Sequence, residues 1–119
     1  MLNKAIEMEL GASISYMWQS VILEQTANPS LKETFKESSI NKLKRAMDLG
    51  GRLYTLEGIP TTQTSLENIG NSLKEMIEFD LKAEKDITSI FKDILQKQPS
   101  KAIRTHVYFA RKFLTKRNN

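Results

Sequence analysis

Five charged residues of this chain fall where apolar residues recur at helical spacing: Glu9, Lys42, Arg45, Asp80 and Glu84. A charge that is taken out of water is costly unless a group of opposite charge meets it. Three acids and two bases can neutralise one another, so one use for these residues is a buried ion cluster. Inward carboxylates have a second use, because their oxygens are ligands for metal ions. The sequence therefore suggests either a structural ion cluster or a metal centre.

Four segments show the 3.6-residue apolar repeat of amphipathic helices, at about residues 2–26, 31–57, 73–95 and 100–117. The first two are joined by a short turn, so we expect them to pack antiparallel. The polar stretch between the second and third is long enough to cross the bundle from end to end. We predict one all-α domain over residues 1–119, an antiparallel four-helix bundle with a long crossover between helices two and three.

Sequence signals mark several of the helix ends. Ser30 with Glu33, and Ser72 with Glu75, have the spacing of capping boxes, in which side chains satisfy the free N–H groups of a first turn. Gly58 is expected to adopt the left-handed conformation that ends the second helix, because glycine tolerates positive φ. These signals predict the limits of helices two and three.

The composition excludes several kinds of site. The chain has no cysteine, so it has no disulfide and no thiolate ligand, which fits a cytoplasmic protein. Its single histidine, His106, excludes a two-histidine zinc motif. No apolar run is long enough to span a bilayer, and the N-terminus lacks the apolar block of a signal peptide. We therefore expect a cytoplasmic protein with no membrane span.

The charge is distributed unevenly along the chain. Residues 1–96 hold 14 acidic and 11 basic residues, a net charge of −3, whereas residues 97–119 hold seven basic residues and no acid. Six of these define a predicted basic surface: Lys101, Arg104, Arg111, Lys112, Lys116 and Arg117. Such a surface can bind nucleic acid or an anionic surface. The alternative is that these cations complement the dipole of the last helix and keep it soluble.

Several stretches together resemble one family: Leu2-Asn3-Lys4-Ala5, Glu9-Leu10, Leu56-Glu57-Gly58-Ile59-Pro60, Asn68-Ile69-Gly70, Glu75-Met76 and Asp80-Leu81-Lys82-Ala83-Glu84. Over about residues 2–86 the chain is similar to the bacterioferritins, within the ferritin-like superfamily. The resemblance implies a ferritin-like bundle. It also implies that Glu9 and Glu84 occupy iron-ligand positions, with Tyr16 where the family has a tyrosine beside the iron.

The departures from this pattern fall at the metal site. Lys42 stands where the family has a bridging glutamate, and Arg45 where it has a histidine ligand. Leu43 replaces the haem-ligating methionine. His106 faintly resembles the family's last ligand, but Ile103 stands where a glutamate should precede it. Because ammonium and guanidinium groups offer no lone pair, the di-iron site is predicted to be degenerate, with no cofactor and no haem.

These observations predict a protein without ferroxidase activity, which self-associates and acts as a structural or accessory subunit. We expect a homo-oligomer or a complex with another protein. Trp18, Met8 and Leu23 are expected at a subunit contact, because aromatic residues and methionine concentrate in interface cores. Two alternatives stay open: an iron-binding or storage protein with a remodelled site, and a basic module that binds nucleic acid or an anionic surface.

Overall fold

The computed structural model describes residues 1–26, 28–65 and 68–97. Within these ranges all regular structure is helical and there is no strand. The predicted all-α bundle is therefore confirmed. The fourth helix, expected at 100–117, lies outside the described residues.

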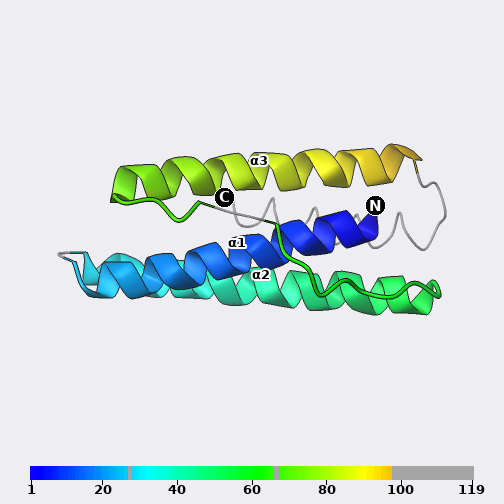
Figure 1. Cartoon of the computed structure of the whole chain (residues 1–119), viewed down its shortest axis with the longest axis horizontal. Coiled ribbons are helices and arrows are strands. Elements are labelled where there is room, and N and C mark those ends of the chain that lie inside the picture. Colours follow the sequence, from blue (N-terminus) through cyan, green and yellow to red (C-terminus); the bar gives the residue numbers. More distant parts are fainter. Residues whose placement is uncertain (27, 66–67, 98–119) are drawn as a thin grey trace.

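Three helices lie side by side with their long axes nearly aligned (Figure 1): α1 (Leu2–Glu24), α2 (Pro29–Thr55) and α3 (Leu73–Lys97). α1 packs antiparallel against α2 along most of its length and against α3 on another side. The predicted limits differ from the observed ones by up to two residues. α1 is thus the element that connects the other two described helices.

Two serines hold α1 and α2 close together. The Ser13 hydroxyl donates to the carbonyl oxygen of Ser39 at 2.8 Å, and the Ser39 hydroxyl donates to that of Ser13 at 2.7 Å. One turn after Ser13 on α1 and one turn before Ser39 on α2, the rings of Tyr16 and Phe35 meet edge-on, with centroids 5.9 Å apart. The small hydroxyls let the two backbones approach, and their bonds fix the register of the pair.

The start of α2 differs from the prediction. The N-cap is Asn28 and Pro29 occupies the first helical position, so Ser30 lies inside the helix and the expected Ser30 cap is wrong. Proline suits this position because its fixed φ is helical and its missing N–H has no partner there in any helix. The cap of α3 is confirmed, since the Glu75 N–H donates to the Ser72 hydroxyl at 3.2 Å.

The end of α2 also corrects a prediction. The residue with positive φ is Glu57, at 68°, and not Gly58. Gly58 follows it, and its N–H donates to the Leu53 carbonyl at 2.8 Å, which closes the last turn in a Schellman motif. A Cβ on Gly58 would lie 2.4 Å from Leu53 Cδ1. A larger residue here would have to displace the Leu53 side chain, so glycine is favoured by this close approach rather than by its own φ.

The crossover between α2 and α3 is tied to α1. The Asn3 side chain donates to the Ile59 carbonyl at 3.0 Å and accepts from the Thr61 N–H at 2.8 Å. Further along, the Ser65 N–H donates to the Glu7 carbonyl at 3.1 Å. The crossover therefore follows the surface of α1 on its way to the start of α3 (Figure 1).

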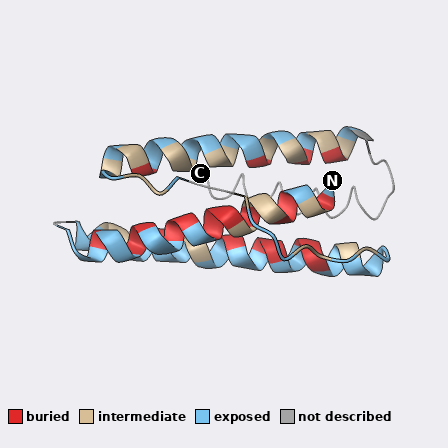
Figure 2. Ribbon diagram, in the orientation of Figure 1, coloured by how far each residue is buried: buried red, intermediate tan, exposed pale blue. Residues whose placement is uncertain are grey.

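The core lies between the three helices (Figure 2), and on α3 the buried positions recur on one side of the helix. Its buried apolar residues are Leu2, Ala5, Ile6, Ala12, Tyr16, Leu23, Phe35, Ala46, Leu49, Met76, Ile87, Phe91 and Ile94. The interior also contains polar side chains, and these form the candidate site.

Candidate functional site

Lys42 lies at the centre of a cluster that joins all three described helices. Its Nζ is 2.9 Å from Oε1 of Glu9 on α1 and 2.7 Å from Oε1 of Glu84 on α3. The side chains of Lys42 and Glu9 are completely buried, and that of Glu84 is 21% exposed. The ammonium group reaches its two carboxylates because the apolar face of α2 points its side chain between α1 and α3.

Burial dominates the electrostatics of Glu9. Loss of solvent raises the pKa of the Glu9 carboxyl, while the charge and hydrogen bond of Lys42 lower it, and the charge of Arg45 lowers it further. Arg45 is itself 8% exposed, so it acts on Glu9 through protein rather than through water. Glu84 has the opposite effect and raises this pKa. The pKa of the Glu9 carboxyl therefore depends on its burial and on the charges of three neighbouring side chains.

Asp80 lies one turn before Glu84 on α3, where it meets Gln19 of α1. Gln19 Nε2 donates to Asp80 Oδ1 at 3.0 Å and also to the Ile69 carbonyl of the crossover at 2.8 Å. The sequence reasoning did not single out Gln19, which is completely buried. The available signal was its spacing, because Gln19 follows the buried residues Ala5 and Ala12 at seven-residue intervals.

Tyr16 is buried beside Phe35, on the same side of α1 as Glu9 and two turns further along. His106 and the six predicted basic-surface residues lie outside the described residues, so their roles stay predictions. Of the residues expected at a subunit contact, Trp18 is 47% exposed and Met8 is half-buried. Leu23 is only 1% exposed and packs in the core, so its expected place in a contact is wrong.

The described residues around Lys42 do not fit a di-iron pair. Two ferrous ions carry about four positive charges and need several carboxylate and imidazole donors. Glu9 and Glu84 supply carboxylates, but Lys42 places a cation between them, and neither it nor Arg45 has a lone pair to donate. Over residues 1–26, 28–65 and 68–97, no three Asp, Glu, His or Cys side chains are grouped to hold a metal ion.

Comparison with known proteins places this arrangement in a family. The model of the ferritin-like domain matches residues 1–118. The chain belongs to the ferritin-like family. The resemblance noted from the sequence is thereby confirmed at the level of the family.

Individual relatives are bacterioferritins. The chain is 36% identical over 93 residues to a bacterioferritin from Brucella melitensis biotype 1, and the match covers 77% of this chain and 58% of that protein. The crystal structure of BfrA from M. tuberculosis superposes with a TM-score of 0.86 at 24% identity, covering 97% of this chain and 72% of that one. A second structure of the Mycobacterium tuberculosis bacterioferritin BfrA gives 0.81 at 21% identity, covering 96% and 77%.

The conclusions from these matches are limited by their coverage and by their sequence identity. The chain spans little more than half the length of the Brucella bacterioferritin, and the structural matches at this identity establish the fold. Within the described ranges, none of the three helices combines the length and the apolar character needed to cross a membrane.

Proposed function

We propose that this chain is a ferritin-like protein that has lost a functional di-iron ferroxidase centre and acts as a non-catalytic, self-associating structural or accessory subunit in the cytoplasm. The observation that carries the proposal is the position of Lys42 Nζ, 2.9 Å from Glu9 and 2.7 Å from Glu84. An ammonium group here pairs with both carboxylates that a metal would need, and together with Arg45 it balances their two negative charges. It also fills the space between them.

Electrostatics support this assignment. A metal entering between Glu9 and Glu84 would meet the positive charges of Lys42 and Arg45 in a water-poor interior, where repulsion between cations is stronger than in water. To admit the metal, Lys42 would have to lose both bonds and leave a fully buried position. The cluster therefore stabilises the three-helix contact and replaces the iron chemistry of the relatives.

Iron titration tests the loss of the centre. Fe(II) is added anaerobically to the pure protein and binding is measured by calorimetry, after which oxygen uptake is followed on exposure to air. We expect no stoichiometric binding and an uptake rate equal to that of iron in buffer. A bacterioferritin with an intact centre is the positive control. Tight stoichiometric binding, or accelerated oxygen uptake, would instead support an iron-binding protein with a remodelled site.

A variant shows whether the cations themselves exclude metal. Lys42→Glu combined with Arg45→His places, by the family resemblance, a bridging glutamate and a histidine ligand beside Glu9 and Glu84. We expect this variant to bind Co(II), detected by its visible absorption, while the wild type does not. Circular dichroism confirms that both are folded. Equal Co(II) binding by the two proteins would contradict the role given to Lys42.

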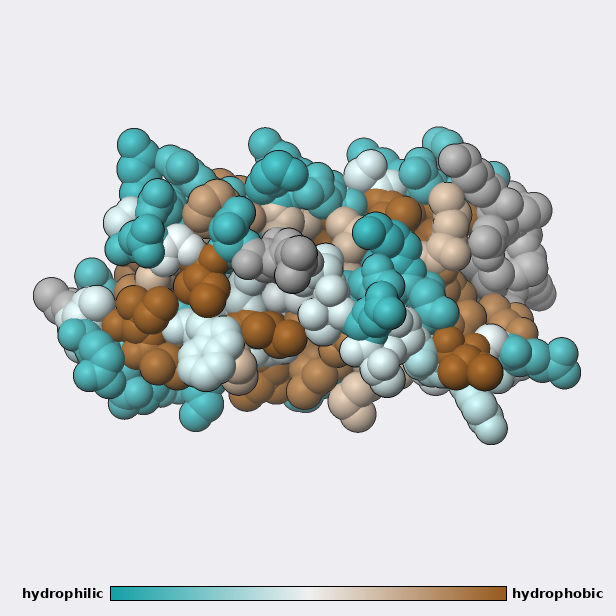
Figure 3. All heavy atoms as spheres, in the orientation of Figure 1, coloured by the Kyte–Doolittle hydropathy of each residue, from teal (hydrophilic) through white to brown (hydrophobic). Residues whose placement is uncertain are grey.

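An apolar face on α1 and α2 supports self-association. Figure 3 shows apolar side chains in a band over these helices, whereas the outer surface of α3 is mostly hydrophilic. The exposed large apolar and aromatic residues of these two helices are Ile14, Met17, Trp18, Val21, Ile22, Ile40, Leu43, Met47 and Tyr54. Beside them a groove of about 530 Å³ opens between Leu10 of α1 and Met47 of α2. Single exposed apolar residues are ordinary, but a continuous patch marks an interaction site.

The area of the α1–α2 face is close to the area that a second copy of the chain would bury in a stable dimer. α1 has 23 residues. At about 1.5 Å per residue and about 10 Å of width for each helix, the α1–α2 face covers roughly 700 Å². A stable interface buries about 800 Å² on each partner.

Light scattering tests the association. We expect the wild type to be a dimer or a larger assembly, and Trp18→Glu with Met47→Glu to shift it to monomer. Leu81→Glu is the matched control, because Leu81 is 58% exposed on α3. A wild-type protein that stays monomeric at high micromolar concentration would contradict the proposal.

A further inference from the structure

Two stripes of residues with the same spacing run along the α1–α2 face (Figure 3). The α1 stripe is Leu10, Ile14, Met17, Trp18 and Val21, and the α2 stripe is Leu43, Met47, Gly50, Gly51 and Tyr54. Each member of the α2 stripe follows its counterpart in the α1 stripe by 33 residues, from Leu10 and Leu43 to Val21 and Tyr54. Because the members are three, four or more whole turns apart, each stripe stays on one side of its helix.

The two stripes are complementary in size. Met17 and Trp18 are large side chains that are 41% and 47% exposed on α1. The matching positions of α2 are Gly50 and Gly51, which line the groove of about 530 Å³ described above. α1 therefore presents projections at the positions where α2 presents a hollow.

The packing within one chain does not account for these two glycines. Among the described residues, a Cβ on Gly51 would have no atom within 4 Å, and a Cβ on Gly50 would make only ordinary contact with Pro60, at 3.5 Å. Glycine inside a helix costs about 0.5–1 kcal/mol relative to alanine. Two such residues in the last turns of α2 therefore indicate the close approach of a group from outside the chain.

The contacts between α1 and α2 fix where the stripes lie along the bundle. Three of these contacts join residues whose numbers add up to 51 or 52: Glu9 with Lys42, Ser13 with Ser39, and Tyr16 with Phe35. Residues related in this way lie at the same level along the two antiparallel helices. Leu43 is therefore level with residue 8 or 9 of α1, and Gly51 is level with its start. The α1 stripe covers one end of the face, and the α2 stripe covers the other.

A single twofold axis can bring the two stripes together. The axis is perpendicular to the face, midway between α1 and α2, at about the level of Glu9. Because the helices are antiparallel and the spacings are equal, a half-turn about it lays the α1 stripe of one copy along the α2 stripe of a second copy. All five pairs then meet at once: Leu10 with Leu43, Ile14 with Met47, Met17 with Gly50, Trp18 with Gly51, and Val21 with Tyr54. Twofold pairing is the commonest symmetry of homo-oligomers, and each contact occurs twice in it.

We infer that two copies of the chain pair about this axis, with Trp18 of each copy seated over Gly51 of the other and Ile14 against Met47. The inference rests on the proposed self-association and adds its symmetry and its contacts. Tryptophan is among the residues that contribute most to binding when they fill a pocket of the partner. The groove of one copy is thus completed by a side chain of the other.

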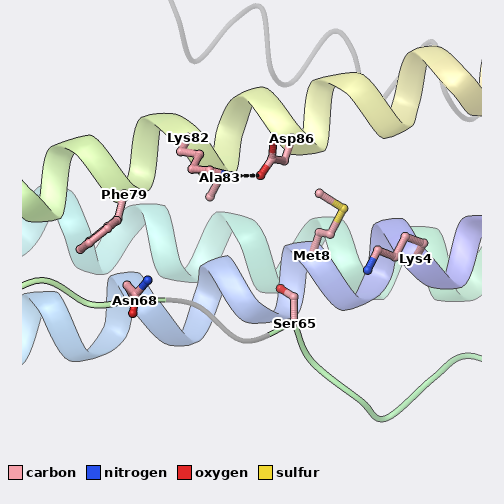
Figure 4. A pocket seen from close by; sticks show the side chains of 8 residues that line it. All are labelled: Lys4, Met8, Ser65, Asn68, Phe79, Lys82, Ala83 and Asp86. Atoms are coloured by element: carbon pink, nitrogen blue, oxygen red, sulfur yellow. Dashed lines mark hydrogen bonds and ion pairs between the residues drawn. The ribbon is translucent and has the colours of Figure 1, made fainter.

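Met8 takes no part in this contact. Figure 4 shows its side chain extending from α1 toward α3, where it lines a cavity together with Phe79 and Ala83. Its expected place at a subunit contact therefore does not lie on the α1–α2 face, whereas that of Trp18 does.

Introduced cysteines report the contacts, because the chain has none of its own. In Ile14→Cys with Met47→Cys, the two positions of one chain lie about 14 Å apart along the helices, since Met47 is level with residue 4 or 5. A disulfide needs Cα atoms within about 7 Å, so any bond between them joins two copies. We expect air oxidation to convert most of this variant to a covalent dimer on a non-reducing gel.

A pair that is out of register is the matched control. Val21 is 43% exposed and Ile14 is 42% exposed, so cysteines at the two positions are equally accessible. About the proposed axis, Val21 of one copy lies two turns away from Met47 of the other. Val21→Cys with Met47→Cys should therefore give at least about tenfold less covalent dimer than Ile14→Cys with Met47→Cys.

An exchange of sizes tests the Trp18 contact. Trp18→Ala removes the projection and Gly51→Trp fills the hollow, and each should weaken dimerisation at least about tenfold in analytical ultracentrifugation. The two changes together should give a dimer at least about tenfold tighter than Gly51→Trp alone, because a large residue again faces a small one. Lys85→Trp, at an exposed position of α3, should leave dimerisation unchanged. Circular dichroism checks that each variant is folded, and Gly51→Trp has room in the single chain.

The outcomes separate this inference from the proposed function. If the wild type dimerises but the two cysteine pairs give equal amounts of covalent dimer, the pairing is wrong and self-association stands. A combined Trp18→Ala and Gly51→Trp variant that associates no better than Gly51→Trp would overturn the Trp18 contact in the same way. A monomeric wild type would overturn both self-association and this pairing. The iron titration is independent of all these results.

Discussion

α1 contains two completely buried polar side chains, Glu9 and Gln19, and its neighbours satisfy them in opposite ways. Glu9 meets a full positive charge, because Lys42 reaches across from α2 and continues to Glu84. Gln19 is neutral and donates to the carbonyl of Ile69 and to the carboxylate of Asp80. We call these the Lys42 cluster and the Gln19 cluster.

The two clusters differ in how much the free energy of unfolding falls when one member is removed. Removing one member of a buried ion pair leaves a charge with neither water nor partner, which costs about 3–5 kcal/mol. Removing a neutral donor leaves polar groups short of one bond, which costs about 1–3 kcal/mol. The Lys42 cluster therefore controls whether three helices can pack together, whereas the Gln19 cluster fixes the position of the crossover.

The largest effect is expected from Lys42→Met, which keeps an unbranched side chain only one atom shorter and removes its charge. The free energy of unfolding should fall by about 3–5 kcal/mol near neutral pH, because Glu9 stays buried without its ammonium partner. Urea denaturation followed by circular dichroism measures this. Adding Glu9→Gln should recover part of the loss. A loss below about 1 kcal/mol would mean that water or another cation reaches Glu9.

The same variant has a predicted pH dependence. Burial already raises the pKa of Glu9, and loss of Lys42 removes the two effects of that residue that lower it. A carboxyl whose pKa is raised on folding binds more protons when folded, so stability falls as the pH rises through that pKa. Lys42→Met should therefore cost more at about pH 8 than at about pH 5. A cost that is constant between these values would contradict the coupling of Glu9 to Lys42.

An intermediate effect is expected from Gln19→Leu, which removes the bonds to Ile69 and Asp80. We expect a loss of about 1–3 kcal/mol in urea denaturation. Faster hydrogen exchange should follow in the crossover around Ile69, and less so in α2. Gln25→Leu is the control, because Gln25 is exposed at the end of α1. If exchange in the crossover does not change, the Gln19 cluster does not hold it.

A smaller effect is expected from Ser39→Ala. This variant removes one hydroxyl of the reciprocal pair with Ser13, and neutral hydrogen bonds contribute about 0.5–1.5 kcal/mol each. The measurement is again urea denaturation, with exposed Ser89→Ala on α3 as the control. A loss as large as that of Lys42→Met would mean that the neutral Ser13–Ser39 pair stabilises the fold as much as the buried ion pairs of Lys42.

The smallest effect is expected from Lys82→Gln, which breaks the exposed pair with Asp86 one turn away. Such pairs contribute about 0.3–0.5 kcal/mol on a helix surface. The stability should therefore stay close to that of the wild type. A large loss of stability would mean that Lys82 has a structural role beyond its pair with Asp86.

Much of the fold could be predicted, because the 3.6-residue repeat reports which side of each helix faces the core. The Ser72 cap followed from local chemistry and is confirmed. The ends of α2 were predicted wrongly, since Pro29 competed with Ser30 as a start signal and Glu57 took the left-handed conformation expected of Gly58. The first error comes from choosing between adjacent residues that each suit the position, and the second from assigning positive φ by residue type, which favours glycine over glutamate.

The candidate site was only partly accessible to the same reasoning. Periodicity placed charged residues on inward faces, but it gave no distances and it passed over Gln19. The exposed half of α1 carries Ile14 and Trp18, residues of the same apolar character as the buried half. Hydrophobicity alone therefore could not indicate which half of α1 packs against α2.

The sequence by itself determined that this chain is helical and that it belongs with the ferritin-like proteins, and its resemblance to bacterioferritins predicted cations at two ligand positions, Lys42 and Arg45. Only the tertiary structure decided that one ammonium group meets carboxylates of two other helices, while Asp80 meets Gln19 one turn away. The reason is physical: side-chain type and spacing are properties of a single helix. Contact between charges depends on the register at which separate helices pack.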